Sequence, residues 1–422
     1  MGSCQSSGGG AAVAQPSSAS PAASVAAQHS ADKAAAPGPA AKPADGSHHH
    51  GVGVKASGEV HDKYQMGKAL GSGSFATARL ATNRETGEKV AIKTLLRNHE
   101  MFDKELLDLE IKVMKRVSQD SAKPGTNRCI QLYEVYEDKK AIHLVEELAS
   151  GGELFDRILD LGHFSEKLAA KVINQVLEGI AHMHSVGCVH RDLKPENLLM
   201  LSSEVGTAEY DMIKIADFGL SALGDTHDEN GQMNTVCGTP DYIAPEVVII
   251  AAEGPHSRRK YDAKVDVWAI GVILYTMLCG FPPFWSDNMA DMLHMIKHGD
   301  YSFPAPAWDH ISPETKAFVT RLLTVDPKRR PTATEAMLDP WIAQVDNLGD
   351  TALKIKDTLG SYVAARRGRQ VFNTVRIAKR FEIMMRPSGN SVAKELAGDA
   401  KPAAEGAPAD ADATEAAEAA PE

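Results

Sequence analysis

Eight consecutive residues near the middle of the chain combine the side chains that phosphoryl transfer requires. Residues 190–197 read His-Arg-Asp-Leu-Lys-Pro-Glu-Asn. Within them Asp192 can accept a hydroxyl proton, Lys194 can neutralise charge on a phosphoryl group, and Asn197 offers an amide oxygen to a hard divalent cation. Arg191 is available to bind a phosphate elsewhere. Chemistry that needs all four groups within one short loop is phosphoryl transfer.

Further motifs stand in order on both sides of this loop. Asp217, in Asp-Phe-Gly, follows the strand-like run 212–216 and is the expected magnesium ligand, since Mg²⁺ favours oxygen donors. Upstream, Lys93 closes a β-branched run and can reach the phosphates of a nucleotide. Glu110 lies on an amphipathic helical pattern, and an ion pair with Glu110 would hold Lys93 in place.

A glycine-rich loop precedes all of these motifs. Because glycine lacks a Cβ, the backbone N–H groups of such a loop can approach a phosphate closely. The loop consists of Gly71, Ser72, Gly73, Ser74, Phe75 and Ala76. Alone, a glycine-rich loop is usually a turn, and a lysine at the end of a strand is usually solvated. The ordered set of motifs argues against coincidence.

On these motifs the chain resembles a eukaryotic Ser/Thr protein kinase, most similar to the calcium/calmodulin-dependent group. The resemblance covers residues 64–342, and motifs of the group stand at 151–158, 237–240 and 323–327. It implies an α+β, bilobal protein kinase fold with a small β-rich lobe and a large, mainly helical lobe. The implied reaction transfers phosphate from ATP, with Mg²⁺, to serine or threonine of protein substrates.

The resemblance also implies a role for each residue of the site. Asp192 is the catalytic base and Lys194 stabilises the transferring group, while the metal ligands are Asn197 and Asp217. Lys93, held by Glu110, positions the phosphates of ATP. The nucleotide site is expected to comprise the glycine-rich loop together with Leu70, Ala78, Lys93, Glu110, Glu147, Ala149 and Glu153.

Two carboxylates bear on substrate choice. In the group that the chain resembles, the residues at Glu153 and Glu196 face the position three before the phosphoacceptor and select arginine there. Glu153 has an alternative role on the ribose of ATP. We expect a basophilic kinase.

Activation is expected to run through Thr235, where members of the group carry a phosphothreonine. A phosphate on Thr235 would pair with Arg191 and order the surrounding segment. The alternative is an unmodified loop threonine. Across the large lobe we expect Glu246 to pair with Arg330 as a structural contact.

Departures from the family pattern fall in the nucleotide site. Ala76 stands where a third glycine is usual and Ala78 where valine is common; both are small enough to preserve backbone approach. Glu146 falls at the gatekeeper position, where an apolar or hydroxyl side chain is usual. A carboxylate there is costly unless it is paired. We expect Glu146 to reach Lys93 or a bound water and to alter the access of inhibitors.

Composition narrows the classes of function. The chain has 422 residues, 43% of them hydrophobic, which is enough for two lobes, and its net charge of −11 argues against general nucleic-acid binding. Its five cysteines show no metal-ligand spacing, which suits a reducing compartment. The most apolar run, residues 268–278, is too short to span a bilayer and predicts a buried helix.

Both ends of the chain are expected to be disordered. Residues 1–58 are rich in Ala, Ser, Gly and Pro, and residues 387–422 are acidic and rich in alanine. Gly2 and Ser6 fit the N-myristoylation pattern, and Cys4 is placed for S-palmitoylation. Two acyl chains would attach the protein stably to the cytoplasmic face of a membrane, with a cytosolic pool. The alternative is an ordinary Met-Gly start.

A basic segment follows the kinase region, within residues 345–386. Between positions 362 and 386 the chain has seven basic residues and one acid, with Phe372 and Phe381 as bulky anchors. The resemblance and the composition favour an autoinhibitory segment that binds calmodulin. Alternatives are an extra helix on the large lobe and binding to anionic lipid. For the whole protein, the other class weighed is a catalytically weak, kinase-like membrane scaffold that binds calmodulin; Glu146 is its main support.

Overall fold

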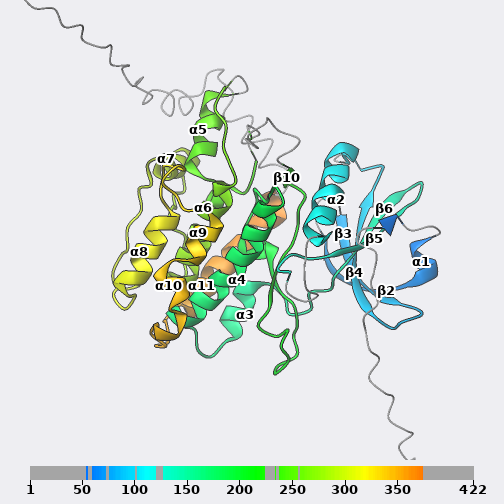
Figure 1. Ribbon diagram of the computed structural model, residues 1–422, viewed down its shortest axis with the longest axis horizontal. Coiled ribbons are helices and arrows are strands. Elements are labelled where there is room, and N and C mark those ends of the chain that lie inside the picture. The colour runs from blue at the N-terminus through cyan, green and yellow to red at the C-terminus, as the bar shows by residue number, and fades with distance from the viewer. Residues whose placement is uncertain are drawn as a thin grey trace, which may run out of the picture. The chain divides into compact units, whose positions relative to one another are not determined.

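The computed structural model describes residues 54–55, 59–72, 76–99, 102–119, 127–223, 233, 237–254 and 257–373. These residues form a β-rich lobe followed by a helical lobe (Figure 1). This is the two-lobed kinase architecture predicted from the sequence.

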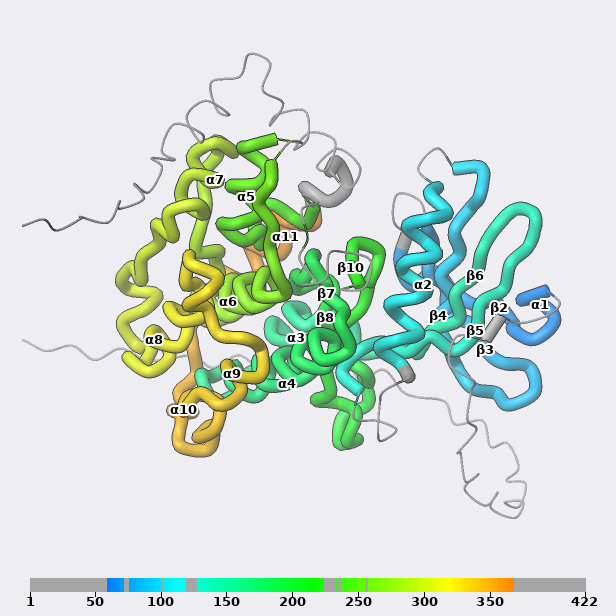
Figure 2. The backbone as a smooth tube through the Cα atoms, turned by 45° about the horizontal axis from the view of Figure 1, so that its top comes forward, coloured from blue at the N-terminus to red at the C-terminus, as the bar shows by residue number. Residues whose placement is uncertain are grey.

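The small lobe is built on one sheet of six strands in the order β1-β5-β6-β4-β3-β2. The main strands are antiparallel: β2 (Tyr64–Ser72), β3 (Ala76–Asn83), β4 (Lys89–Leu96), β5 (Leu132–Glu137) and β6 (Ala141–Glu146). The short helix α1 (Val60–Lys63) leads into β2, and α2 (Lys104–Gln119) lies against the sheet (Figures 1 and 2). On β4, Val90, Ile92 and Leu95 enter the core and fix which side chains face the site.

One strand corrects a predicted boundary. Strand β1 (Val54–Lys55) lies inside residues 1–58, for which we expected no ordered structure, and it pairs in parallel with β5. The pairing uses backbone groups at an open sheet edge, so it requires little of the side-chain composition from which disorder was predicted.

The helical lobe surrounds two long helices. α4 (Glu166–Ser185) is capped by the preceding residue Ser165, whose side chain accepts from the Leu168 N–H, and its apolar face is buried. α6 (Lys264–Cys279) is buried nearly all round, as expected of a helix at the centre of a lobe, and it contains the predicted buried run 268–278. The surrounding helices are α3 (Leu154–Asp160), α5 (Pro245–Glu253), α7 (Met289–His298), α8 (Pro313–Leu322), α9 (Ala333–Met337) and α10 (Pro340–Ala343).

Short paired strands carry the loops of the site. β7 (Cys188–Val189) pairs with β10 (Ala222–Leu223), and β8 (Leu198–Met200) pairs with β9 (Ile213–Ile215). Since β8 and β9 are antiparallel, the residue before β8 and the segment after β9 come together. Accordingly, the Ala216 N–H donates to the carbonyl oxygen of Asn197 at 2.8 Å.

The last described helix, α11 (Lys356–Asn373), packs on the helical lobe. It buries Leu359, Tyr362 and Val363 and contacts α3 and α6. Its first turn is fastened at the end of α6, where the Thr358 hydroxyl donates to the Cys279 carbonyl at 3.1 Å. Gly280 has a φ of +87°, and an added Cβ would collide with Thr358, so glycine is required for this close approach.

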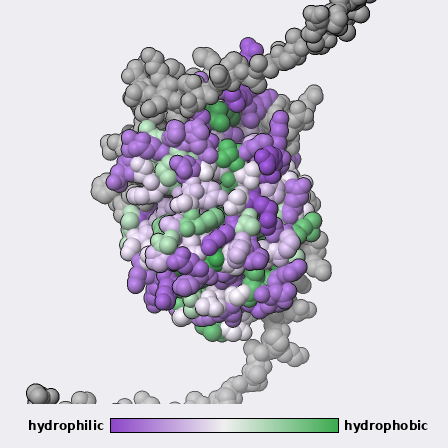
Figure 3. Space-filling model, turned by 90° about the vertical axis from the view of Figure 1, so that its left-hand side faces the viewer, coloured by the Kyte–Doolittle hydropathy of each residue, from purple (hydrophilic) through white to green (hydrophobic). Residues whose placement is uncertain are grey.

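The surface gives two further observations. The face of the helical lobe in Figure 3 is mostly polar, with small and separate apolar areas. No helix among the described residues is long and apolar enough to cross a bilayer.

Candidate active site

Two strained backbone positions mark the site. Arg191 and Asp217 have φ values of +67° and +62°, the positive values found for residues other than glycine in the described chain. Such conformations persist only where surrounding contacts enforce them. The buried Asp266 carboxylate accepts from the N–H groups of His190 and Arg191 at 2.9 and 2.8 Å. Burial opposes ionisation of Asp266, but hydrogen bonds led by His184 outweigh it and lower its pKa.

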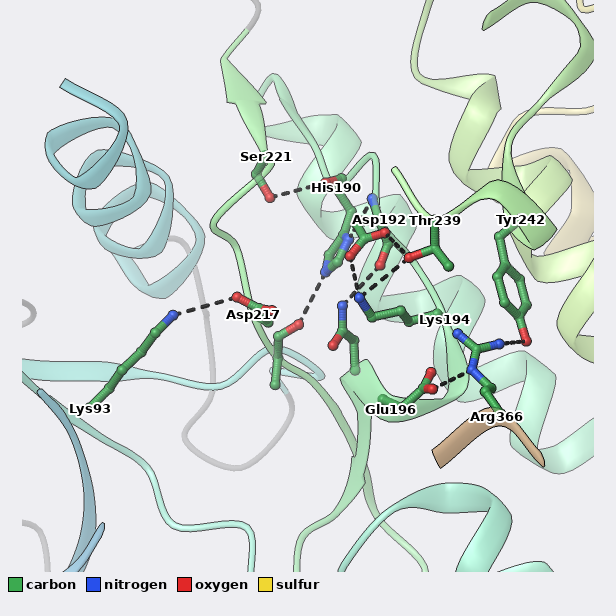
Figure 4. A network of polar contacts seen from close by, with 12 residues as sticks. Lys93, His190, Asp192, Lys194, Glu196, Asp217, Ser221, Thr239, Tyr242 and Arg366 are labelled. Atoms are coloured by element: carbon green, nitrogen blue, oxygen red, sulfur yellow. Dashed lines mark hydrogen bonds and ion pairs between the residues drawn. The ribbon is translucent and has the colours of Figure 1, made fainter. Parts of the chain in front are cut away.

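Asp192 is held through both carboxylate oxygens (Figure 4). Lys194 Nζ donates to Oδ2 at 2.5 Å, and the Thr239 hydroxyl donates to Oδ1 at 2.7 Å. Lys194 Nζ also lies 3.4 Å from Thr239 Oγ1. Burial disfavours the charge on Lys194, but Asp192 outweighs it and raises the pKa of the lysine. The carboxylate is thus fixed in one orientation, as a group that must meet a substrate hydroxyl requires.

Thr239 is a site residue to which the sequence motifs assigned no role. The motif 237–240 marked the family, but only the fold brings this hydroxyl to the catalytic carboxylate, 47 positions earlier in the chain.

Asn197 and Asp217 suit a magnesium ion. The Asn197 amide nitrogen donates to the Asp192 carbonyl at 2.9 Å, which leaves the amide oxygen as the group able to bind a cation. The nearby Lys93 ammonium lowers the pKa of Asp217 although burial opposes ionisation, so the carboxylate is charged. The described residues contain no cluster of three or more His, Cys, Asp or Glu able to hold a metal.

Lys93 joins the small lobe to the metal side of the site. Its Nζ lies 2.7 Å from Glu110 Oε1, on α2, and 3.5 Å from Asp217 Oδ1. Burial alone would lower the pKa of Lys93, but Glu110 and Asp217 outweigh it and raise the pKa. Phe218, the residue after Asp217, is buried against His190, with ring centroids 5.7 Å apart.

The nucleotide-side residues are described in part. Leu70 lies 44% exposed on β2, and Ala76 and Ala78 are half-buried on β3. Gly71 is exposed near the end of β2. The rest of the glycine-rich loop before Ala76 lies outside the described residues, namely the side chain of Ser72 and all of Gly73, Ser74 and Phe75. Ala149 follows β6 with a half-buried side chain. The Glu147 side chain is engaged elsewhere, with Lys214, so its contribution to an adenine site is its main chain.

Glu146 was expected to reach Lys93 or a bound water; within the described residues the ion pair with Lys93 is not formed, and the contact with water stays a prediction. Within the described residues its carboxylate has no hydrogen bond and no ion pair within 4.0 Å, because Glu110 and Asp217 occupy the Lys93 ammonium. Burial raises the pKa of Glu146 to about 7; the Lys93 charge opposes this rise, and the negative charges of Glu110 and Asp217 add to it.

Arg191, expected to bind a phosphate on Thr235, contacts two groups of the described chain. Its Nε donates to the Leu220 carbonyl at 2.6 Å, and its Nη1 lies 3.4 Å from the Tyr261 hydroxyl. The Arg191 side chain thus already holds the segment after Asp217.

Thr235, the expected site of phosphorylation, lies outside the described residues, as do Gly2 and Cys4. The expected ion pair of Glu246 with the fully buried Arg330 is present and bidentate: Nη1 and Nη2 of the arginine donate to Oε1 and Oε2 of the glutamate at 2.8 and 2.9 Å.

Two arginines of α11 meet the carboxylates predicted to select substrate arginine. Arg366, 7% exposed, forms an ion pair with Glu196, and its Nη1 donates to the Tyr242 hydroxyl at 2.5 Å (Figure 4). Arg367 contacts Asp156 and lies 3.6 Å from Glu153 Oε2. Burial raises the pKa of Glu153, and Arg367 opposes that rise.

From the sequence these arginines were only part of a basic stretch, and Asp156 and Tyr242 had no predicted role. The sequence held one signal for these contacts: it contains arginines, in the basic segment, of the kind that Glu153 and Glu196 were expected to bind in a substrate.

The sequence is similar to those of known protein kinases. Residues 64–342 match the family model described as protein kinase domain. The chain is 38% identical over 347 residues to calcium/calmodulin-dependent protein kinase type 1 of Caenorhabditis elegans, covering 81% of this chain and 92% of the relative. It is 39% identical over 329 residues to the protein of that name from Macrobrachium nipponense, with coverages of 77% and 88%. A probable myosin light chain kinase of Dictyostelium discoideum is 38% identical over 308 residues, 73% of each chain.

Proposed function

The chain belongs to the protein kinase family, and from that premise we propose a Ser/Thr kinase that selects arginine near the phosphoacceptor and is restrained by its own helix α11. The kinase activity itself follows from membership, and ATP with Mg²⁺ is its phosphate source. The arginine preference, the restraint by α11, calmodulin binding and membrane attachment are the proposed parts.

The residues of the site divide the catalytic work. Asp192, fixed by Lys194 and Thr239, orients the substrate hydroxyl and accepts its proton. Lys194, beside Asp192, would stabilise the charge that develops on the transferring group. When bound between Asn197 and Asp217, Mg²⁺ would neutralise phosphate charge. The residues expected of an active kinase are all present and make contacts that suit catalysis, which favours the active kinase over the scaffold alternative; these residues are Lys93, Glu110, Asp192, Asn197 and Asp217.

The contact between Arg366 and Glu196 carries the proposal of restraint. A buried guanidinium on this carboxylate has the chemistry of the substrate arginine that Glu196 is expected to bind. Arg367 stands in the same way against Asp156 and Glu153. Since each carboxylate can hold one guanidinium well, α11 and an arginine-containing substrate compete. We infer that α11 lowers basal activity by this competition.

Calmodulin is the proposed partner that removes α11. The support is the basic composition after position 362, with Phe372 and Phe381 nine residues apart, and the likeness to kinases whose names include calmodulin. The anchors lie in residues whose side chains or backbone are outside the described part. The part of α11 up to Arg367 packs on the helical lobe, so calmodulin would have to compete with the burial of Leu359, Tyr362 and Val363.

Basal kinase activity of Arg366→Ala tests the restraint. Without calcium and calmodulin, we expect this variant to phosphorylate an arginine-containing peptide about tenfold faster than wild type, because the variant lacks one charged interaction that holds α11 in place. Lys356→Ala, an exposed charge at the start of the same helix, should behave as wild type. Equal basal rates in all three proteins, with wild type fully active, would show that α11 does not restrain the kinase.

Membrane attachment is tested separately. Labelling with a myristate analogue should mark wild type and spare Gly2→Ala, and Cys4→Ser should weaken retention on membranes because one acyl chain binds only marginally. Equal labelling of wild type and Gly2→Ala would contradict the proposed anchor.

A further inference from the structure

A buried lysine with no assigned role lies behind the nucleotide site. Lys214 on β9, three positions before Asp217, is 0% exposed. Its Nζ donates to the Asn127 carbonyl at 2.7 Å and forms an ion pair with Glu147 Oε1 at 2.9 Å. Lysine is almost never fully buried unless it is paired. The contacts with Asn127 and Glu147 compensate the burial of this charge, so Lys214 depends on both groups being held in place.

Glu147 is the residue that immediately follows β6, in the segment 147–153 that leads from the small lobe to α3. Its N–H donates to the Gln131 carbonyl at 2.9 Å, and its Oε2 accepts from the Gln131 N–H at 3.3 Å. Burial raises the pKa of Glu147, and the Lys214 charge opposes that rise. Main chain and side chain of this connecting residue are therefore both fixed.

Asn127 extends the contacts to α2. Its amide nitrogen donates to the Val117 carbonyl in the last turns of α2 at 3.1 Å, and its side-chain oxygen accepts from the Cys129 N–H at 2.9 Å. α2 also carries Glu110, the partner of Lys93. One polar network thus joins the segment between the lobes, the strand before Asp217 and the helix that holds Lys93.

We propose that Lys214 and Glu147 are positioning residues for nucleotide binding. They hold the backbone from Glu147 to Ala149 at the place where the resemblance puts adenine, so the pair sets the affinity for ATP rather than the chemical step. The proposal needs only ATP binding by the kinase domain and is independent of the arginine preference and of α11. A displacement of this backbone by a fraction of an ångström would misalign its donors and acceptors.

The paired variant Lys214→Met/Glu147→Gln separates positioning from simple stability. Each single change leaves one buried charge unpaired, and we expect it to lower the melting temperature by about 5–10 °C. Removing both charges should restore the melting temperature to within about 3 °C of wild type. Because the double variant folds but lacks the ion pair, we expect its KM for ATP to rise about fivefold while kcat stays within twofold.

The neighbouring ion pair between Arg128 and Glu178 gives a matched control. Arg128 follows Asn127 but pairs, at 2.9 Å, with a residue of α4 and not with the segment between the lobes. Arg128→Met/Glu178→Gln should leave the KM for ATP unchanged. The proposal is overturned if the double variant of Lys214 and Glu147 keeps the wild-type KM, or if the control raises it equally.

A milder change tests the same point without removing charge. Glu147→Asp keeps the carboxylate but withdraws it by one methylene, so we expect an intermediate rise in KM and in the dissociation constant of a fluorescent ATP analogue. Analogue affinity equal to wild type in Glu147→Asp and in the double variant would also overturn the proposal.

Discussion

Arg366 of α11 forms a buried ion pair with Glu196 of the catalytic loop, 170 positions earlier in the chain. The guanidinium also donates to the Tyr242 and Tyr362 hydroxyls, at 2.5 and 3.0 Å. A charge pair so enclosed cannot be shared with a second arginine unless the first leaves. Access of an arginine-containing substrate to Glu196 and retention of α11 are therefore opposed.

Glu196→Gln should weaken discrimination among substrates. For two peptides that differ only by arginine or alanine three positions before the acceptor, we expect the ratio of kcat/KM values to fall about tenfold, since glutamine cannot offer the substrate arginine a negative charge. Peptide kinetics at one ionic strength give this ratio. Glu204→Gln, at an exposed position, serves as control. An unchanged ratio would exclude Glu196 from arginine recognition.

Asp192→Asn should abolish most of the phosphoryl transfer. The amide cannot accept the hydroxyl proton and pairs poorly with Lys194, so kcat should fall by about 10²- to 10⁴-fold. The KM for ATP should stay within about twofold, because the partners of Lys93 are unaffected. Peptide phosphorylation with purified variants measures both constants, and Asp309→Asn, an exposed carboxylate, is the control. A kcat within threefold of wild type would rule out Asp192 as the base.

Glu146→Gln should change stability in a pH-dependent way. The pKa of Glu146, about 7 in the folded protein, lies above its ordinary value of 4.5, so between these values the native state keeps a proton that the unfolded chain has lost. The free energy of unfolding of wild type therefore falls as pH rises from 4.5 to 7, and above pH 7 the full destabilisation from the buried charge of Glu146 is present. The glutamine variant should be more stable than wild type by about 2–3 kcal/mol at pH 8 and nearly equal at pH 5.

Urea unfolding of both proteins at pH 5 and pH 8 gives this difference directly. The same offset at both pH values would show that Glu146 does not ionise near neutral pH, and that any effect of glutamine is steric.

Glu246→Gln should destabilise the helical lobe. Arg330 is fully buried, and both of its terminal nitrogens bond to Glu246, so the change leaves a buried guanidinium without its counter-charge. We expect a loss of about 3–5 kcal/mol in the free energy of unfolding. Lys104→Ala removes a half-exposed pair with Asp108 and should cost less than about 0.5 kcal/mol. Equal, small losses from denaturant unfolding would show that the buried pair contributes little.

The sequence was sufficient to predict the parts of the site that lie within short motifs. Asp192, Lys194 and Asn197 are local to one loop, and Asp217 is brought to them by a short hairpin whose strand pattern is readable. The resemblance carried by these ordered motifs implied the kinase family and its two lobes. That Glu110 is the partner of Lys93 could be inferred from the resemblance, and the structure gives its distance.

The contacts that were not predicted depend on tertiary packing. Thr239 meets Asp192, and Lys214 meets Glu147, only after separate elements have packed, and no periodicity or spacing encodes those pairs. Of the two contacts predicted for Glu146, the one with Lys93 is absent among the described residues for a related reason. Sequence placed both residues near the nucleotide but could not show that two other carboxylates would already hold the ammonium.

The hydroxyl of Tyr242 has a consequence for how two signals combine. Tyr242 lies seven positions after Thr235, in the segment that supplies Thr239 to the site, and it bonds to both Tyr362 and Arg366 of α11. One residue thus belongs to the segment that phosphorylation would reorder and to the surface that α11 covers. We propose that release of α11 and modification of this segment are coupled through Tyr242, and any free-energy change that one imposes on the other is then reciprocal.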